Sequence, residues 1–165
     1  MYLIKGKQKG LTLLELMIVI AIIGILASVV LASLNSARSK GGDASVRSGL
    51  VNLSRQAAIF FDLNNGVYSS STLNCSVGAG NLGGMCTGIF AVPTGSTPPA
   101  NQSLGAMLVQ ISRQVTTAPV VANATSTAYA VQAPLRNPSN AFWCVDSSGN
   151  SRQSTTALGT NTICP

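Results

Sequence analysis

The sequence predicts an α+β fold in which a long N-terminal helix packs on a small antiparallel sheet. Three features of the 165 residues support this prediction. An apolar run occupies residues 11–34, a helical spacing of apolar residues continues beyond it, and short segments rich in Val, Tyr, Phe and Trp fill the last third of the chain. Because a helix and a sheet must each bury an apolar face, packing one on the other is a stable solution. We expect a basic leader at residues 1–10, a transmembrane and assembly helix at 11–34, an amphipathic continuation of that helix at 35–63, and an extracytoplasmic head domain at 64–165.

Residues 11–34 are long and apolar enough to cross a membrane. Of these 24 positions 19 are apolar, and as a helix they extend about 36 Å, more than the ~30 Å hydrocarbon core of a bilayer. Their apolar side chains cover every helical face, which is typical of a helix in lipid or inside a large assembly. The alternative is a secretory signal peptide, which has a shorter apolar stretch and a clear small-residue cleavage site.

The basic residues around this segment predict its orientation. Lys5, Lys7 and Lys9 precede it and favour a cytoplasmic N-terminus, which places the C-terminal domain outside. Arg38 and Lys40 follow it and oppose this preference without reversing it. We therefore expect a single-pass protein of the cytoplasmic membrane.

Glu15 is the anomaly within the apolar run. A carboxylate at mid-bilayer costs about 2.5–3.5 kcal/mol, so such residues are functional candidates. Glu15 follows Leu11 by four positions, and the two share a helix face. If the chain were cut after Gly10, the new α-amino group of Leu11 would lie within reach of this Glu15 or of a neighbouring chain's. The alternative is that Glu15 merely lies near the headgroups.

These residues resemble the N-terminus of type IV prepilins and pseudopilins. The resemblance rests on the basic leader, on Gly10 followed by Leu-Thr-Leu-Leu-Glu, and on the apolar helix containing Gly24. It is specific over about residues 5–40. Two positions depart from the family pattern, because most members have Phe where this chain has Leu11, and Ala32 stands where proline is common.

The resemblance implies a set of processing and assembly steps. A prepilin peptidase would cleave between Gly10 and Leu11 and N-methylate Leu11, and Glu15 would neutralise the amino terminus of an adjacent subunit. The implied partners are other copies in a homo-oligomeric filament, other pilins, the inner-membrane assembly machinery, and membrane lipid before assembly. The implied final location is a surface filament or the periplasm.

Residues 35–63 continue the helix in amphipathic form. Apolar residues recur at helical spacing, namely Val46, Leu50, Leu53, Ala57 and Phe60 or Phe61. Gly41-Gly42 weakens the helix at the junction, so a kink, a hinge or a complete break is expected there. Asn64-Asn65-Gly66 should end the helix, because these residues tolerate positive φ.

The head domain is predicted to contain loops, one short helix and antiparallel strands. Residues 67–100 are rich in Ser, Gly, Asn, Thr and Pro, and we expect loops there. A second helix is expected over Ser103–Val115, with its aliphatic residues on one face. Strands are expected at Thr127–Gln132, Ala141–Val145 and Ser151–Ala157.

Four cysteines predict two disulfides in an extracytoplasmic domain. Three pairings are possible, and we favour Cys75–Cys86 and Cys144–Cys164 because each closes a local loop. A zinc site is the competing interpretation. It is disfavoured because the gaps of 10, 57 and 19 residues between successive cysteines contain no C-x₂₋₄-C spacing.

The composition disfavours catalysis. There is no histidine, and the only acidic residues are Glu15, Asp43, Asp62 and Asp146. General acid–base catalysis and metal sites usually recruit these residue types. We therefore predict no catalytic residues, no metal and no cofactor.

The leading prediction for function is a structural subunit of a type IV pilus-like surface filament. A pseudopilin of a type II secretion-like system is the near alternative. A minor competence pilin that binds DNA is another, with Arg113, Arg136 and Arg152 as phosphate contacts, although the net charge without residues 1–10 is only +3. The last alternative is a single-pass anchored protein that never polymerises.

Overall fold

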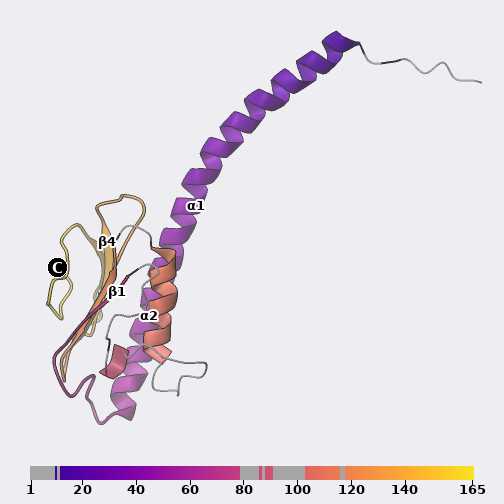
Figure 1. Cartoon of the computed structure of the whole chain (residues 1–165). Coiled ribbons are helices and arrows are strands. Elements are labelled where there is room, and N and C mark those ends of the chain that lie inside the picture. Colours follow the sequence, from indigo (N-terminus) through magenta and orange to yellow (C-terminus); the bar gives the residue numbers. More distant parts are fainter. Residues whose placement is uncertain (1–9, 11, 79–85, 87, 91–102, 116–117) are drawn as a thin grey trace, which may run out of the picture. The chain divides into compact units, whose positions relative to one another are not determined.

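The computed structural model describes residue 10 and residues 12–78, 86, 88–90, 103–115 and 118–165. The chain divides into two compact units, the first ending at Arg38 and the second running from Ser39 to Pro165. The boundary falls inside the first helix, α1 (Leu13–Leu63) (Figure 1).

The part of α1 that belongs to the first unit exposes its apolar side chains. The exposed fractions of its large apolar residues run from 41% at Leu34 to 77% at Leu13. Within the described residues, α1 is the one helix long and apolar enough to cross a membrane, and none of its most apolar window is buried. The predicted apolar helix is therefore present, with its side chains free to meet lipid or other helices.

The second-unit part of α1 forms one side of the hydrophobic core. The apolar residues expected on its inner face are buried or packed against the core, namely Val46, Leu50, Leu53, Ala57, Phe60 and Phe61. Gly41 and Gly42 are both helical, so the expectation of a possible complete break was wrong. The helix ends where predicted, because Asn65 and Gly66 adopt positive φ and the Gly66 N–H donates to the carbonyl of Phe61.

The sheet is a five-stranded antiparallel meander in the order β1-β2-β3-β4-β5. Its strands are β1 (Leu73–Val77), β2 (Val120–Ala124), β3 (Tyr129–Pro134), β4 (Phe142–Asp146) and β5 (Ser151–Ser154). A 3₁₀ turn, η1 (Gly88–Phe90), and a second helix, α2 (Ser103–Gln114), lie between β1 and β2. The predicted α+β fold class is confirmed.

Two strands were missed by the sequence analysis. β1 lies within the segment expected to be loops, and β2 precedes the first expected strand. Both contain small or polar residues, and the alternating burial of Leu73, Cys75 and Val77 is too short a pattern to stand out. These segments are extended because their backbones form hydrogen bonds with a neighbouring strand, not because of local propensity.

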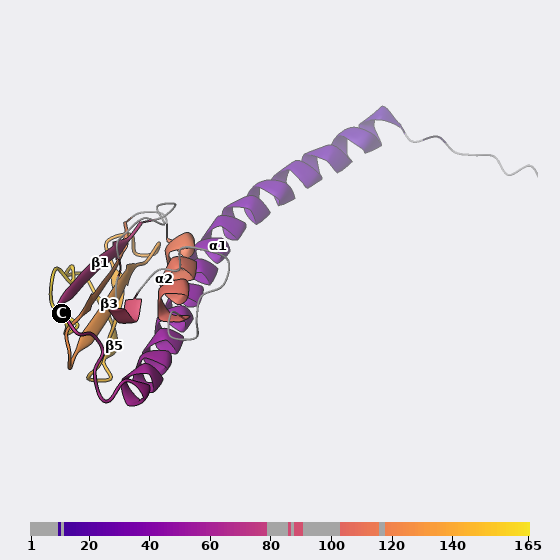
Figure 2. The same ribbon diagram turned by 60° about the horizontal axis from the view of Figure 1, so that its bottom comes forward.

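Both faces of the sheet are covered. In the second unit, α2 and α1 lie against one face and the C-terminal segment lies against the other (Figure 2). On the second face Leu158 and Cys164 pack with Ala130 and Cys144 in a small separate cluster. Because it lies between these two layers, β3 is buried along its whole length.

The four cysteines form two disulfides, Cys75–Cys86 and Cys144–Cys164. These are the two pairs that the local-loop argument favours. Phe142 and Trp143 are both half-buried, and Trp143 packs at the margin of the core.

Candidate functional site

The start of α1 is closed by hydrogen bonds between Thr12 and Glu15. The Glu15 carboxylate accepts from the backbone N–H of Thr12 at 2.8 Å and from its hydroxyl at 3.0 Å. In return, the backbone N–H of Glu15 donates to the Thr12 hydroxyl oxygen at 3.3 Å. This reciprocal arrangement is a capping box, in which the residue before the helix and its third residue satisfy each other's free N–H groups. Glu15 therefore has an intramolecular role as well as the expected intermolecular one.

The capping box was visible in the sequence and was overlooked. Thr12 and Glu15 have the T-x-x-E spacing that precedes an apolar run. The remaining predicted site residues at this end are Gly10, which is exposed, and Leu11, which lies outside the described residues. The structure therefore brings Glu15 together with Thr12 but does not describe the position of Leu11.

The rest of the first unit presents an almost continuous apolar surface. The Ser28 hydroxyl within it donates to the carbonyl of Ile25 at 2.7 Å, which satisfies this polar group locally. A shallow apolar groove lies near its end, lined by Val29, Val30, Ser33, Leu34 and Ala37. Such a surface favours burial in lipid or against other apolar helices.

Asp43 ties the second-unit part of α1 to the connection between β3 and β4. Its two carboxylate oxygens accept from the backbone N–H groups of Arg136 at 2.7 Å and Asn137 at 3.0 Å. The Arg136 guanidinium in turn donates to the carbonyl of Gln114 at the end of α2. One buried carboxylate thus fixes the position of a loop relative to two helices.

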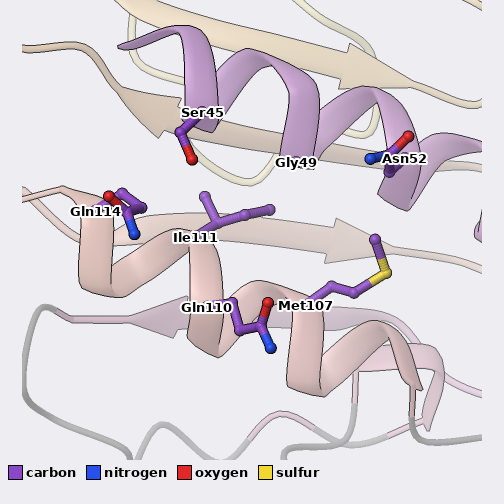
Figure 3. A pocket seen from close by; sticks show the side chains of 7 residues that line it. All are labelled: Ser45, Gly49, Asn52, Met107, Gln110, Ile111 and Gln114. Atoms are coloured by element: carbon purple, nitrogen blue, oxygen red, sulfur yellow. The ribbon is translucent and has the colours of Figure 1, made fainter. Parts of the chain in front are cut away.

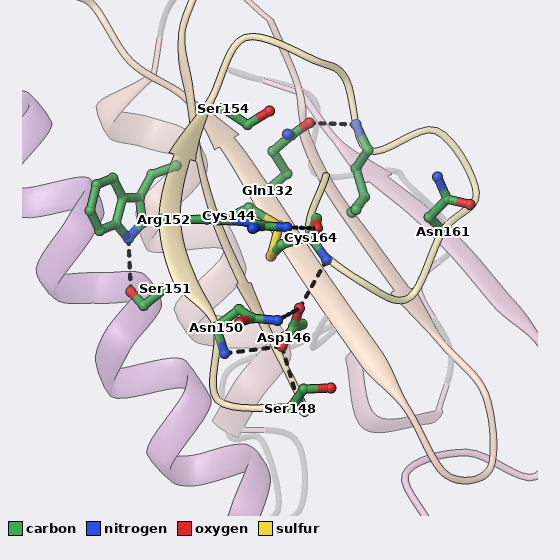
Figure 4. Close-up of a disulfide and its surroundings, with 12 residues drawn as sticks. Gln132, Cys144, Asp146, Ser148, Asn150, Ser151, Arg152, Ser154, Asn161 and Cys164 are labelled. Atoms are coloured by element: carbon green, nitrogen blue, oxygen red, sulfur yellow. Dashed lines mark hydrogen bonds between the residues drawn. A yellow bond between two sulfur atoms is a disulfide. The ribbon is translucent and has the colours of Figure 1, made fainter.

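Asp146 anchors the C-terminal segment on the other face of the sheet (Figure 4). Its carboxylate accepts from the backbone N–H groups of Ser148, Asn150 and Cys164 and from the Asn150 side chain, at 2.9 to 3.1 Å. Burial alone would raise the pKa of Asp146, but these hydrogen bonds outweigh it and hold the pKa below its usual value. Asp146 is therefore a charged structural anchor.

Two further polar residues hold the same segment, and sequence reasoning missed them. The Asn123 amide donates to the carbonyls of Gly159 and Asn161. Gln132 donates to the carbonyl of Thr156 and accepts from the N–H of Leu158. Gln132 lies within an expected strand, and a polar side chain there was the available signal, because such a group requires a partner when it is buried.

The groove between α1 and α2 offers no titratable group (Figure 3). It is lined by Ser45, Gly49, Asn52, Met107, Gln110, Ile111 and Gln114. Gly49 is required by the close approach of the helices, because a Cβ there would lie 2.9 Å from Cγ1 of Ile111. This groove is a tight helix contact rather than a site with acid–base chemistry.

Comparison with known families adds one finding to this geometry. Residues 5–31 match the family model described as the prokaryotic N-terminal methylation motif. The chain carries the type IV prepilin signature. The matched range includes the start of α1 with Thr12 and Glu15. No curated protein and no solved structure matches the chain.

This motif gives the protein a coarse functional class. It supports a precursor of the type IV pilin or pseudopilin type, and it points to a structural protein rather than an enzyme. Together with the apolar N-terminal helix, it fits a precursor anchored in a membrane. It implies processing by a peptidase and assembly with other pilins.

The arginines considered for DNA binding are largely engaged within the head. Arg113 is exposed, whereas the Arg136 guanidinium donates to the carbonyl of Gln114. Arg152 donates to the carbonyl of Cys164. Because two of the three side chains already have internal acceptors, they are poorly placed to bind phosphates.

Proposed function

We propose that the protein is a structural subunit of a type IV pilus-like surface filament. The observation that carries this proposal is the location of the methylation motif on a helix whose apolar side chains are exposed. Such a surface is stable only in lipid or among other apolar helices. The subunit therefore leaves the membrane by exchanging lipid for copies of itself and for other pilins.

Glu15 favours the environment of neighbouring helices in a filament over lipid. We propose cleavage between Gly10 and Leu11 and N-methylation of Leu11, which leave a cationic amino terminus near the start of α1. In lipid, a carboxylate and an ammonium group are each costly. In a filament, the Glu15 carboxylate of one subunit pairs with the amino terminus of the next, and Thr12 holds Glu15 until that pairing forms. Assembly thereby removes two unfavourable charges from the membrane.

Two measurements test this proposal. The mass of the membrane-extracted protein should correspond to a chain that begins at methylated Leu11. Replacing Glu15→Ala should leave membrane insertion intact and strongly reduce filament yield in electron micrographs. A mature chain that still begins at Met1, or wild-type filament levels from the Glu15→Ala variant, would contradict it.

A pseudopilin of a type II secretion-like system is the second candidate, because the same methylation motif supports it. The two differ in the product of assembly. A pilus subunit forms long filaments outside the cell, whereas a pseudopilin forms short periplasmic fibres. Immunogold labelling of intact cells with an antibody to the head domain distinguishes them.

A further inference from the structure

A basic pocket lies at the beginning of the second unit. It is lined by Lys40, Asp43, Ala44 and Arg47 of α1 and by Asn137 from the connection between β3 and β4. Lys40 and Arg47 are seven residues apart and therefore lie on the same face of the helix, two turns from each other. The pocket thus has two cationic side chains and one carboxylate.

The carboxylate of this pocket is already used. Both oxygens of Asp43 accept backbone N–H groups, from Arg136 and Asn137. Of the other three acidic residues, Glu15 caps the start of α1, Asp146 holds the C-terminal segment, and Asp62 is exposed at the far end of α1. Within the described part of the chain, no carboxylate forms a salt bridge with Lys40 or Arg47. Neither cation of the pocket therefore has a salt-bridge partner in the described structure, and the two cations outnumber the one carboxylate.

Arg47 is held in place and has an unused donor. Its guanidinium lies 4.7 Å from the centre of the Trp143 ring, and its Nη2 donates to Oε1 of Gln153 at 3.3 Å. Its Nε is buried without a hydrogen-bond partner in the described structure. An arginine fixed by stacking loses little further entropy when it binds an anion, and an unsatisfied buried donor favours one.

The position of the pocket in the chain limits where it lies relative to a membrane. Lys40 follows Leu34, the last residue of the apolar run, by six positions. Even a fully extended chain of that length spans only about 20 Å. If residues 11–34 cross a bilayer, Lys40 therefore lies no more than about 20 Å from the end of the membrane-spanning segment, which keeps the headgroup layer within its reach.

We propose that Lys40, Arg47 and Asn137 bind the phosphate of an anionic phospholipid headgroup and so hold the head domain on the membrane surface before assembly. Lys and Arg donors match phosphate oxygens in charge and geometry. The proposal rests on the membrane-anchored state of the proposed function. It explains why basic residues remain on the side of the apolar segment where they oppose its orientation.

The test uses the full-length chain in micelles of a neutral detergent. Trp143 is the only tryptophan in the chain, so its fluorescence reports on the pocket. Phosphatidylglycerol and phosphatidylcholine with the same acyl chains are titrated in turn, and native mass spectrometry counts the bound lipids. Both lipids carry the phosphate, but the choline cation of phosphatidylcholine makes its headgroup neutral overall and is repelled by Lys40 and Arg47. We therefore expect phosphatidylglycerol to bind about tenfold more tightly.

Two variants assign the binding to this pocket. K40Q leaves the stacking of Arg47 on Trp143 intact, and K40Q/R47Q removes both cations. We expect the preference for phosphatidylglycerol to fall in the first and to disappear in the second. The control R55Q/R113Q removes the same charge from exposed positions of the same unit and should bind as the wild type does. Circular dichroism confirms that each variant is folded.

The outcomes are distinguishable. Equal affinity for the two lipids, or an unchanged preference in K40Q/R47Q, would overturn the proposal. Self-association that depends on Lys40 and Arg47 in the absence of lipid would also overturn it, because the anion would then belong to a second copy. If excess inorganic phosphate displaces the lipid, the pocket recognises the phosphate group itself, which supports the proposal. If inorganic phosphate binds in the pocket and phosphatidylglycerol does not, the pocket is not a lipid site and the proposal is overturned. The mass of the same sample reports N-terminal processing independently, so failure here leaves the filament proposal standing.

Discussion

The backbone N–H of Cys164 donates a 2.9 Å hydrogen bond to Oδ2 of Asp146, while the sulfur of Cys164 is bonded to Cys144. Cys144 and Asp146 are two positions apart on β4 and therefore point to the same face of the sheet. The C-terminal segment is thus fastened to one strand at two adjacent points, one covalent and one electrostatic. This double attachment explains how a segment with little secondary structure can cover a sheet face.

The stability of the head should depend on pH through Asp146. Its pKa is lower in the folded protein than its ordinary value of 3.8. The stabilisation is therefore fully present above that ordinary value and is lost as the pH falls through the folded pKa. At pH 7, D146N should lower the free energy of unfolding by about 1–3 kcal/mol, because an amide NH₂ would face N–H donors.

Urea unfolding in detergent at pH 7 and at pH 3 measures both effects for Asp146. The wild type should lose more stability on acidification than D146N does. D62N, at an exposed aspartate, is the matched control and should behave as the wild type. Equal acid sensitivity of D146N and the wild type would refute the assigned role.

Removing the Cys144–Cys164 disulfide should destabilise the head without unfolding its sheet. The sequence separation of 20 residues predicts a loss of about 3 kcal/mol on the loop-entropy model. Contacts of Asn123 and Gln132 remain in C144S/C164S, so the segment should stay attached in part. Hydrogen exchange should rise at the N–H of residue 164 before it rises in β3. Simultaneous loss of protection at both places would contradict this order.

Alanine at two helical glycines of α1 should have opposite effects. In G49A the new methyl group would lie 2.9 Å from Cγ1 of Ile111, so we expect a loss of about 1–2 kcal/mol from overpacking. In G41A nothing lies within 4 Å of the new group, and the helix should gain up to about 1 kcal/mol. Urea denaturation of the two variants compares them directly. If G49A were as stable as G41A, the tight contact between α1 and α2 would be disproved.

Variants at Thr12 and Glu15 should separate helix capping from charge. E15Q keeps a side chain that can complete a capping box but removes its charge. T12V removes the capping hydroxyl at a cost of about 1 kcal/mol and keeps the charge. We expect E15Q to lose filaments and T12V to retain most of them, as counted by electron microscopy. Loss of filaments in T12V alone would mean that capping, not charge, governs assembly.

Long, strongly patterned segments of this fold were predictable. The apolar run is recognisable by its length, whereas the inner face of α1 from Val46 to Ala57 and the apolar face of α2 repeat the helical period. The last three strands were also found, with their ends shifted by a few residues, because aromatic and β-branched residues mark β3 and β4. In these segments local preference and tertiary burial agree.

Short segments and single polar anchors were not predictable in the same way. β1 and β2 are five residues each, and neither contains enough β-branched or aromatic residues to stand out from the loops around it. Gln132 and Asn123 had no partner that could be named before the C-terminal segment was seen on the sheet. Their hydrogen bonds join residues more than 20 positions apart.

By itself the sequence determined the membrane-compatible helix, its amphipathic continuation and the motif that classifies the chain. All of these depend on residues within a few helical turns of one another. Only the tertiary structure decided that the C-terminal segment covers the second face of the sheet, that Asp43 and Asp146 serve as buried anchors, and that Lys40 and Arg47 line one pocket with Asn137. The physical reason is that burial and hydrogen-bond satisfaction are set by neighbours distant in the chain, which no local pattern records.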